Sequence, residues 1–242
     1  MKFAILGYGK MGKMVEQLLK DDHQEVVATI DNEEEWGSRL DAFKTADVAI
    51  DFSMPSVAVP NMLKAFENHV PIVVGTTGWL EQLGYVSDAC KQFGGSLVYG
   101  SNFSVGANLF MHLNKVLAEV MNHQEQYAAF MEETHHVTKK DAPSGTAIRL
   151  AKDLIACVQR LDHWELSEQT LEDPMALPIK ANRIGTVPGI HKITWHCEDD
   201  DIEITHTAHS RQGFARGAIR AAHWLVEHPG IYDFQDIAID IR

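Results

Sequence analysis

Cysteine, positive charge and long apolar runs are scarce in this 242-residue chain. Its three cysteines, Cys90, Cys157 and Cys197, form no C-x-x-C pair, a pattern typical of buried thiols in a reducing compartment. With 21 basic against 34 acidic residues, the net charge of -13 leaves no basic surface for nucleic acid. No apolar run approaches the roughly 20 residues of a membrane-spanning helix. Because the first residues already form a predicted strand, we expect no signal peptide and a cytoplasmic protein that binds neither nucleic acid nor membrane.

The amino-terminal part of the chain carries a dinucleotide-binding pattern. An apolar run at 2–6 leads into the loop from Gly7 to Gly12, spaced G-x-G-x-x-G, and then into an amphipathic helix. A second apolar run at 25–30 ends in Asp31, nineteen residues after Gly12. The glycines allow a tight turn, close approach of the backbone to a pyrophosphate and close packing of helix on strand, while the acidic side chain accepts hydrogen bonds from the adenosine ribose. The pattern predicts a site for NADH or NADPH.

The residues after Asp31 bear on which nicotinamide cofactor is used. Recognition of the 2′-phosphate of NADPH usually needs a basic side chain here, but Asp31 is followed by one asparagine and the three glutamates 33–35. These carboxylates would repel the phosphate and favour NADH. Lys10 and Lys13, from the glycine loop and the following helix, could offset that repulsion. We therefore expect either cofactor to be used, with a small preference for NADH.

Strands and helices alternate up to about residue 100. Apolar strands predicted at 48–53, 71–75 and 96–99 are separated by helices near 57–68 and 80–93, which is typical of a Rossmann-type, doubly wound parallel sheet of the α/β class. Polar residues follow these strands, and the carboxyl ends of parallel strands are where such sheets bind ligands. The residues expected to contact the cofactor are Gly7, Tyr8, Gly9, Lys10, Met11, Gly12, Asp31, Phe52, Ser53, Gly75, Thr76, Thr77, Ser101, Asn102 and Phe103.

Beyond this region the pattern changes to that of an α+β domain. A long helix is predicted at about 105–122 and a strand at 127–133. Two further strands, at 190–198 and 201–209, are predicted to be antiparallel, because they are joined by a short acidic turn. The polar stretch 163–180 contains two prolines and predicts a long surface loop.

Two domains follow from this change of pattern. Residues 1–103 and 214–242 form the predicted dinucleotide-binding domain, since a helix at 214–226 has an apolar side that is expected to pack back onto the first sheet. Residues 104–213 form the predicted substrate-binding and oligomerisation domain, with a mixed or antiparallel sheet.

The densest group of chemically active residues lies between Glu133 and Ala147. Two histidines, two lysines and a Pro-Ser-Gly-Thr turn fall within these fifteen residues. Pro143 and the N-cap residue Ser144 predict the start of a helix, so the free amides of Gly145 and Thr146 would form a carboxylate site. Imidazole and ammonium groups suit an anion that must also be protonated. We expect this segment to bind a small dianion and to donate a proton to it.

Taken in order, these motifs resemble the dihydrodipicolinate reductase family, the 4-hydroxy-tetrahydrodipicolinate reductases of diaminopimelate and lysine biosynthesis. The His-His-x-x-Lys-x-Asp-Ala-Pro-Ser-Gly-Thr block is the most specific of them. The segments that carry the resemblance span nearly the whole chain: Gly7 to Gly12, 75–78, 101–104, Glu133 to Ala147, 183–185 through His191, 203–206, Ser210-Arg211 and 214–218. The resemblance implies an oxidoreductase that reduces 4-hydroxy-tetrahydrodipicolinate to tetrahydrodipicolinate with NADH or NADPH, and a homotetramer assembled through the sheet of the second domain.

The resemblance also implies a role for each residue of the specific block. His135 is similar to the family's general acid, which protonates the substrate after the hydride has arrived. Lys139 matches a catalytic cation that binds a carboxylate or the imine nitrogen, whereas Lys140 lies outside the motif. The residues expected to bind the dicarboxylate substrate are His136, Lys139, Ser144, Gly145 and Thr146.

The chain departs from the family pattern at two places. Thr134 stands where an apolar residue is expected, and the stretch from Leu161 to Lys180 is short. Two other functions also remain open. An amino-acid dehydrogenase of the aspartate or homoserine type would act on an open-chain amino acid instead of a cyclic dicarboxylate imine. A nucleotide-sensing protein would bind the nicotinamide cofactor without turnover.

Three histidines outside the block and one arginine leave questions that the sequence does not answer. His206 and His209 have H-x-x-H spacing, but they diverge on a strand and no cysteine or carboxylate set completes a zinc site, so we expect no metal. Whether Arg183, His191 and His206 touch the substrate site is left open.

Overall fold

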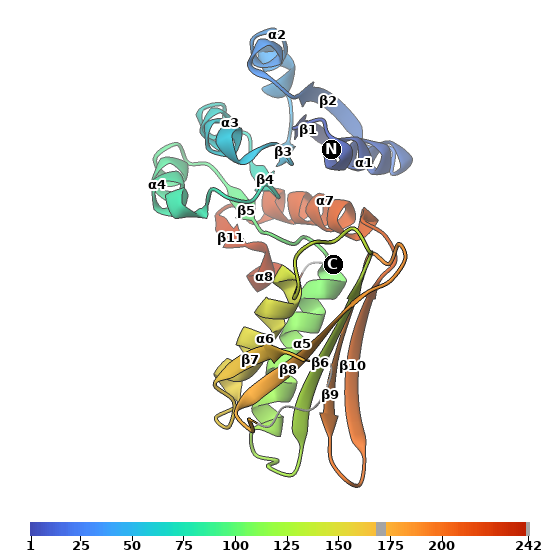
Figure 1. Ribbon diagram of the computed structural model, residues 1–242. Helices are drawn as coiled ribbons and strands as arrows, with labels where there is room; N and C mark the ends of the chain where they lie inside the picture. Colours follow the sequence, from blue (N-terminus) through green and yellow to red (C-terminus); the bar gives the residue numbers. More distant parts are fainter. Residues whose placement is uncertain (168–172, 241–242) are drawn as a thin grey trace. The chain divides into compact units, whose positions relative to one another are not determined.

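The computed structural model describes residues 1–167 and 173–240, and the chain divides into two compact units. Unit 1 comprises Met1–Val105 and Gln212–Arg242, and unit 2 comprises Gly106–Arg211. Each unit is built around a sheet of its own (Figure 1). Among the described residues, no helix is long and apolar enough to cross a membrane.

Unit 1 contains a six-stranded parallel sheet in the order β11-β5-β4-β3-β1-β2. Its strands are β1 (Lys2–Leu6), β2 (Glu25–Ile30), β3 (Val48–Asp51), β4 (Ile72–Val74), β5 (Leu97–Tyr99) and β11 (Ile231–Asp233). The strand order reverses beside β1, and such a reversal is where doubly wound sheets bind ligands. The predicted Rossmann-type fold is confirmed, although β11 was not predicted.

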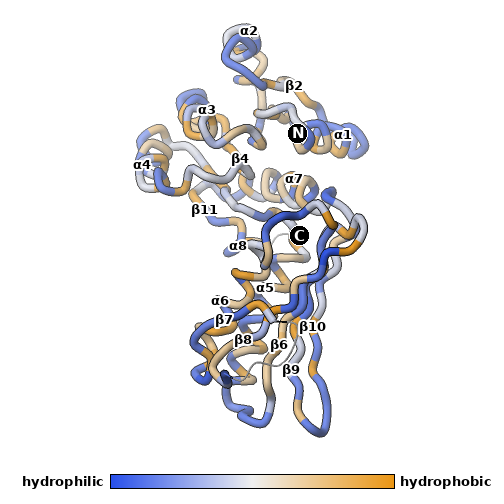
Figure 2. Tube along the Cα trace, viewed as in Figure 1, coloured by the Kyte–Doolittle hydropathy of each residue, from blue (hydrophilic) through white to orange (hydrophobic). Residues whose placement is uncertain are grey.

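Residues of one strand point alternately to two cores on opposite faces of this sheet. Phe3 and Ile5 pack with helices α1 (Lys10–Asp21) and α7 (Gln212–Glu227). Ala4 and Leu6 pack on the other face, against α2 (Glu33–Phe43), α3 (Pro55–Glu67) and α4 (Leu83–Gln92). In Figure 2, polar and apolar residues alternate along these helices, as expected of helices that bury one side. A short 3-10 turn, η1 (Leu80–Gln82), precedes α4, and a short helix, α8 (Phe234–Ile237), follows β11.

Unit 2 contains a five-stranded mixed sheet in the order β10-β9-β6-β8-β7. Its strands are β6 (Ala128–His135), β7 (His163–Leu166), β8 (Ala176–Arg183), β9 (Gly189–His196) and β10 (Asp201–Ala208). β9 is antiparallel to both β6 and β10, while β6 and β7 are parallel to β8. The predicted pair of antiparallel strands near 190–198 and 201–209 is confirmed. The helices α5 (Val105–Met121) and α6 (Gly145–Cys157) pack on one face of this sheet (Figure 1).

The predicted surface loop at 163–180 is wrong where the structure describes it. Residues 163–166 form β7, and β8 begins at Ala176, four residues before the end of that loop. Pro178 is tolerated in β8 because the pairing of β8 with β6 begins only at the next residue, Ile179. The N–H that proline lacks therefore removes no hydrogen bond to β6. The part of the predicted loop at 168–172 lies outside the described residues.

The buried side of this sheet changes from apolar to polar toward one end. Along β6 the buried residues are Met131, Glu133 and His135. Along β9 they run from Trp195 and Ile193 to His191, which is paired with Glu133 across the ladder. The alternation of a strand therefore places three polar side chains in positions that continue the hydrophobic core of unit 2.

Candidate active site

The block from Glu133 to Ala147 folds as the end of β6, a loop and the start of α6. Ser144 is the N-cap of α6, and its Oγ accepts a hydrogen bond from the Ala147 N–H at 3.2 Å. The first helical backbone bond runs from Ile148 N–H to the Ser144 carbonyl at 2.9 Å. The amides of Gly145 and Thr146 precede both bonds, so they belong to the free first turn of the helix. The predicted helix start near Ser144 is confirmed.

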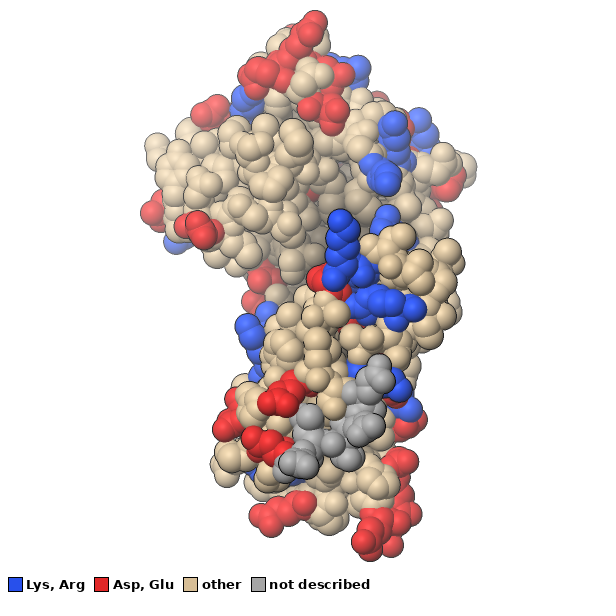
Figure 3. All heavy atoms as spheres, viewed as in Figure 1, with Lys and Arg blue, Asp and Glu red and all other residues tan. Residues whose placement is uncertain are grey.

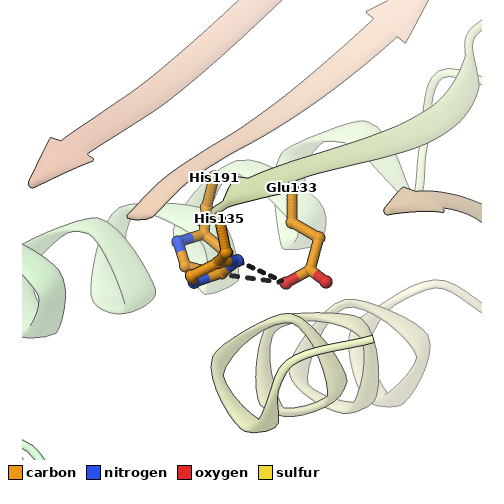
Figure 4. A group of neighbouring side chains, drawn as sticks. All are labelled: Glu133, His135 and His191. Carbon is orange, nitrogen blue, oxygen red and sulfur yellow. Dashed lines mark ion pairs between the residues drawn. The ribbon is translucent and has the colours of Figure 1, made fainter. Parts of the chain in front are cut away.

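Glu133 is the centre of a buried polar cluster that the sequence did not reveal. Both of its carboxylate oxygens accept a hydrogen bond from the Ser144 N–H, at 3.0 and 3.1 Å. Oε1 also accepts one from Nη2 of Arg183 at 3.0 Å. Oε2 lies 3.3 Å from Nδ1 of His135 and 3.8 Å from Nε2 of His191. Figure 4 shows the two imidazoles on the same side of this carboxylate.

The two histidines of this cluster are almost fully enclosed, with exposed fractions of 7% for His135 and 6% for His191. Burial lowers the pKa of His191 to about 4, so this ring is neutral near pH 7. Burial also lowers the pKa of His135, and the negative charge of Glu133 acts in the opposite direction. His135 Nδ1 is close to Glu133 but makes no hydrogen bond, because the ring is not turned to a suitable angle.

The other two predicted substrate-binding side chains lie in the loop between β6 and α6. His136 contacts the Thr138 hydroxyl through Nδ1 at 2.7 Å, and it is half-buried. The ammonium group of Lys139 pairs with a carboxylate oxygen of Asp141 at 2.7 Å. The hydrogen bond from Lys139 lowers the pKa of Asp141. Because Asp141 is exposed, a substrate carboxylate could replace it as the partner of this ammonium group.

The structure thus brings a histidine, an ammonium group and two helix-start amides into one part of unit 2. Gly189 takes part in the arrangement, because a Cβ at this position would lie 3.1 Å from Nε2 of His135. A residue without a Cβ at this position lets β9 pack closely against the His135 imidazole. The groups can bind an anion, through charge and through the amides, and can deliver a proton from an imidazole whose charge is balanced by a buried carboxylate.

In unit 1, the predicted cofactor residues of the first loop have the close packing that a dinucleotide site needs. Gly7 has a positive φ of 83°, and its N–H donates to the Ile30 carbonyl at 2.8 Å. A Cβ on Gly12 would lie 2.1 Å from the Gly7 carbonyl oxygen. The Tyr8 N–H donates to Asp31 at 2.7 Å, which fixes this carboxylate beside the start of α1. The residues present therefore fit NADH or NADPH.

A second group of predicted cofactor residues surrounds Asp51, a buried residue that was not predicted as a site residue. Asp51 accepts hydrogen bonds from the Thr76 hydroxyl at 2.6 Å and from the Ser53 amide at 2.9 Å. Its burial raises its pKa, and these hydrogen bonds lower it. Gly75 packs against the Phe52 ring so closely that a Cβ would lie 2.1 Å from it. Asp51 therefore joins the loops that follow β3 and β4.

The last predicted cofactor segment, 101–103, follows β5. Phe103 is 1% exposed, with its ring against Phe52 and Phe234 and its carbonyl packed on Gly217, so little of this residue is open to a ligand. Asn102 accepts a hydrogen bond from the Ser104 amide at 2.9 Å. His206, whose relation to the substrate site was left open, lies on β10 against Phe110 of α5, and not among the contacts of Glu133.

Comparisons with known proteins identify both units. The family model described as "Dihydrodipicolinate reductase, N-terminus" matches residues 1–103, and "Dihydrodipicolinate reductase, C-terminus" matches residues 106–238. A 4-hydroxy-tetrahydrodipicolinate reductase of Christiangramia forsetii is 42% identical over 241 residues, which cover 100% of this chain and 99% of that protein. The protein of that name from Staphylococcus aureus is 34% identical and covers 98% of this chain and 100% of its own length.

A solved structure is similar to this chain in fold. It is a dipicolinate-bound dihydrodipicolinate reductase from a Paenisporosarcina species, with a TM-score of 0.81 and 23% sequence identity. The alignment covers 98% of this chain and 99% of the other.

Proposed function

Since the chain belongs to the dihydrodipicolinate reductase family, we propose that the buried end of β6 in unit 2 is where its substrate is bound and protonated. The chain is an NADH- or NADPH-dependent oxidoreductase of diaminopimelate and lysine biosynthesis, which reduces 4-hydroxy-tetrahydrodipicolinate to tetrahydrodipicolinate. The amino-acid dehydrogenase alternative is not favoured, because the full-length relatives at 42% and 34% identity are reductases of this dicarboxylate.

The reaction sets the tasks of the site. One hydride and one proton are added to the substrate, and its hydroxyl group leaves as water. The bound nicotinamide supplies the hydride. The protein must hold two carboxylates and supply the proton, and these are the tasks for which the groups on β6 and α6 are suited. The proposal rests on one buried carboxylate, Glu133, which lies 3.3 Å from the His135 imidazole and accepts hydrogen bonds from the amide of Ser144, the N-cap residue of α6.

Each group has one proposed role. His135 donates the proton, because the adjacent carboxylate stabilises its charged form and an imidazole can release a proton to a carbanion or imine. Lys139 leaves Asp141 and pairs with one substrate carboxylate. The Gly145 and Thr146 amides, with Ser144 beside them, receive the second carboxylate at the positive end of α6. His136 lines the same loop and contacts the substrate.

Replacing Lys139 with alanine is expected to lower kcat/KM by about 10- to 100-fold, the value of a charge-assisted hydrogen bond of about 1.5 to 3 kcal/mol. The affinity for dipicolinate, a dicarboxylate that is not reduced, should fall by a similar factor, as calorimetry would measure. Lys140→Ala is the matched control, because Lys140 is the exposed neighbour and makes no ion pair among the described residues. Equal effects of the two substitutions would contradict the role of Lys139.

For unit 1 we propose the cofactor site, with a small preference for NADH. The three glutamates at the start of α2 are its support, and Figure 3 shows acidic side chains gathered over that helix. Glu35 accepts a hydrogen bond from the Asp31 N–H at 2.7 Å, so two carboxylates lie where a 2′-phosphate would have to be placed. Lys64 is paired with Glu33 at 2.7 Å, and Lys10 and Lys13 are the cations proposed to bind the phosphate of NADPH.

We also propose that the protein is a cytoplasmic homotetramer assembled through the sheet of unit 2. The support is that α5 and α6 cover one face of this sheet and the outer face carries half-buried residues such as Phe130 and Ile190. Light scattering should give four times the chain mass of 27.1 kDa. A monomer mass at assay concentration would contradict the assembly.

A further inference from the structure

We propose that Glu133 is a positioning residue, which holds the proton-donating ring of His135 and the substrate-binding start of α6 in one fixed arrangement. The proposal rests on the proposed role of His135 and adds a residue that does not itself touch the substrate. It concerns unit 2 alone, so it needs no assumption about the cofactor site.

The two oxygens of Glu133 are divided between two neighbours. Oε1 bonds to Arg183, while Oε2 faces the imidazoles of His135 and His191. The Ser144 N–H reaches both oxygens. Glu133 is 1% exposed, so water does not compete for these bonds. A carboxylate held in this way fixes the N-cap residue by hydrogen bonds and attracts the charged imidazole of His135 from 3.3 Å.

Arg183 extends the arrangement to the loop that carries Lys139. Its Nε donates to the Lys139 carbonyl at 3.3 Å, and its Nη2 donates to the Asp141 carbonyl as well as to Glu133. The guanidinium also neutralises the buried carboxylate. The Glu133–Arg183 ion pair therefore supports all three proposed substrate contacts: the His135 imidazole, the loop that carries Lys139, and the start of α6.

The orientation of the ring assigns a separate task to each nitrogen of His135. Nδ1 faces Glu133, so the proton on Nδ1 of the charged imidazole is balanced by that carboxylate. Nε2 lies beside Gly189 and is the nitrogen left to give a proton away. His191 packs edge-on to this ring, with centroids 5.1 Å apart, and its Nε2 is 3.2 Å from the Ser144 hydroxyl. A small rotation of His135 would complete the bond between Nδ1 and Glu133.

The charged groups around His135 act in opposite directions. Glu133 and the more distant Asp141 favour its protonated form, whereas Lys139 and Arg183 favour the neutral form. The neighbouring His191 is neutral near pH 7 and adds no fixed charge. Glu133 is the buried anion in direct contact, so removing its charge should leave the two cations opposed only by the more distant Asp141 and lower the pKa of His135.

The same cluster has the spacing of a metal site. The contacts of Glu133 favour a role in proton transfer over the binding of a metal ion. Ligand atoms of Glu133, His135 and His191 lie within 4.8 Å of one another. However, the guanidinium of Arg183 is bonded to the same carboxylate at 3.0 Å, and it would repel a divalent cation. The Ser144 N–H already occupies both oxygens. We therefore assign the cluster to the control of a proton.

The test is the pH dependence of kcat in Glu133→Gln, which removes the charge and keeps the size. A proton donor works below its pKa, so a lower pKa of His135 moves the falling limb of the profile to lower pH. We expect a shift of at least about one pH unit and a loss of at least about tenfold in kcat at neutral pH. Glu132→Gln is the matched control. It is the same substitution at the preceding residue of β6, whose side chain points to the opposite face of the sheet.

Several outcomes would overturn the proposal. If the falling limb of the pH profile of kcat is not shifted in Glu133→Gln, Glu133 is a purely structural residue, whether or not kcat or thermal stability falls. An activity of the wild-type protein that is lost on chelation and restored by Zn²⁺ alone would make the cluster a metal site. If Glu133→Gln does not fold, Glu133→Asp decides: a lower kcat with a smaller shift in the same direction supports the proposal, and an unchanged kcat overturns it. No turnover by the wild-type protein would instead reject the proposed function.

Discussion

His135→Gln is expected to lower kcat by about 10²- to 10⁴-fold, the usual contribution of a general acid, and to leave the affinity for NADH unchanged. Glutamine fills much of the space of the buried imidazole and can form hydrogen bonds, but it carries no proton to give. NADH is bound by residues of unit 1, and His135 belongs to unit 2. The two quantities are measured separately, by synthase-coupled turnover and by titration of NADH fluorescence.

His123→Gln is the control for this experiment. His123 is an exposed residue that follows α5 in the same unit, so its loss should change neither quantity. A near-normal kcat in His135→Gln would show that another group protonates the substrate. A loss of NADH affinity in that variant would show that the substitution disturbs more than the proton donor.

Gly12→Ala is the second change with a large expected effect. Its Cβ would lie 2.1 Å from the Gly7 carbonyl oxygen, and a backbone atom cannot move aside as a flexible side chain can. We expect the free energy of unfolding to fall by about 1 to 3 kcal/mol, as for other overpacked sites. If the same free energy is lost from cofactor binding, the Kd for NADH rises by about 5- to 150-fold.

Gly37→Ala is the matched control for Gly12→Ala. Gly37 lies in α2, and a Cβ there meets nothing within 4 Å, so alanine should stabilise the helix by about 0.5 to 1 kcal/mol. Thermal unfolding and NADH titration of both variants decide the point. A Gly12→Ala protein as stable as Gly37→Ala and equally able to bind NADH would show that this loop does not need close packing.

The elements with a strong repeating pattern could be predicted from the sequence, and so could the residues that carry a local motif. The G-x-G-x-x-G loop and the run from His135 to Thr146 are continuous in the chain, so their spacing is visible without a structure. β11 has only three residues, which is too short for any pattern to be detected. β7 has only four residues, and none of them is buried, so no buried face marks it as a strand.

The supporting residues of the site could not be predicted, because they meet only through the register of the sheet. Glu133 and Arg183 are bonded across a separation of fifty residues, and His191 faces Glu133 from the antiparallel strand β9. One signal was present in the sequence. Glu133 and His135 alternate with the apolar Met131, which indicates polar residues on the buried face of a strand. Such residues are buried only where they have partners.

The reaction is assayed as oxidation of the nicotinamide cofactor in the presence of dihydrodipicolinate synthase, which makes the substrate from pyruvate and aspartate semialdehyde. NADH and NADPH are compared in parallel. We expect oxidation that depends on the synthase, with both cofactors used and NADH slightly preferred. Binding of NADH without synthase-dependent oxidation, or oxidoreductase activity only with an open-chain amino acid, would contradict it.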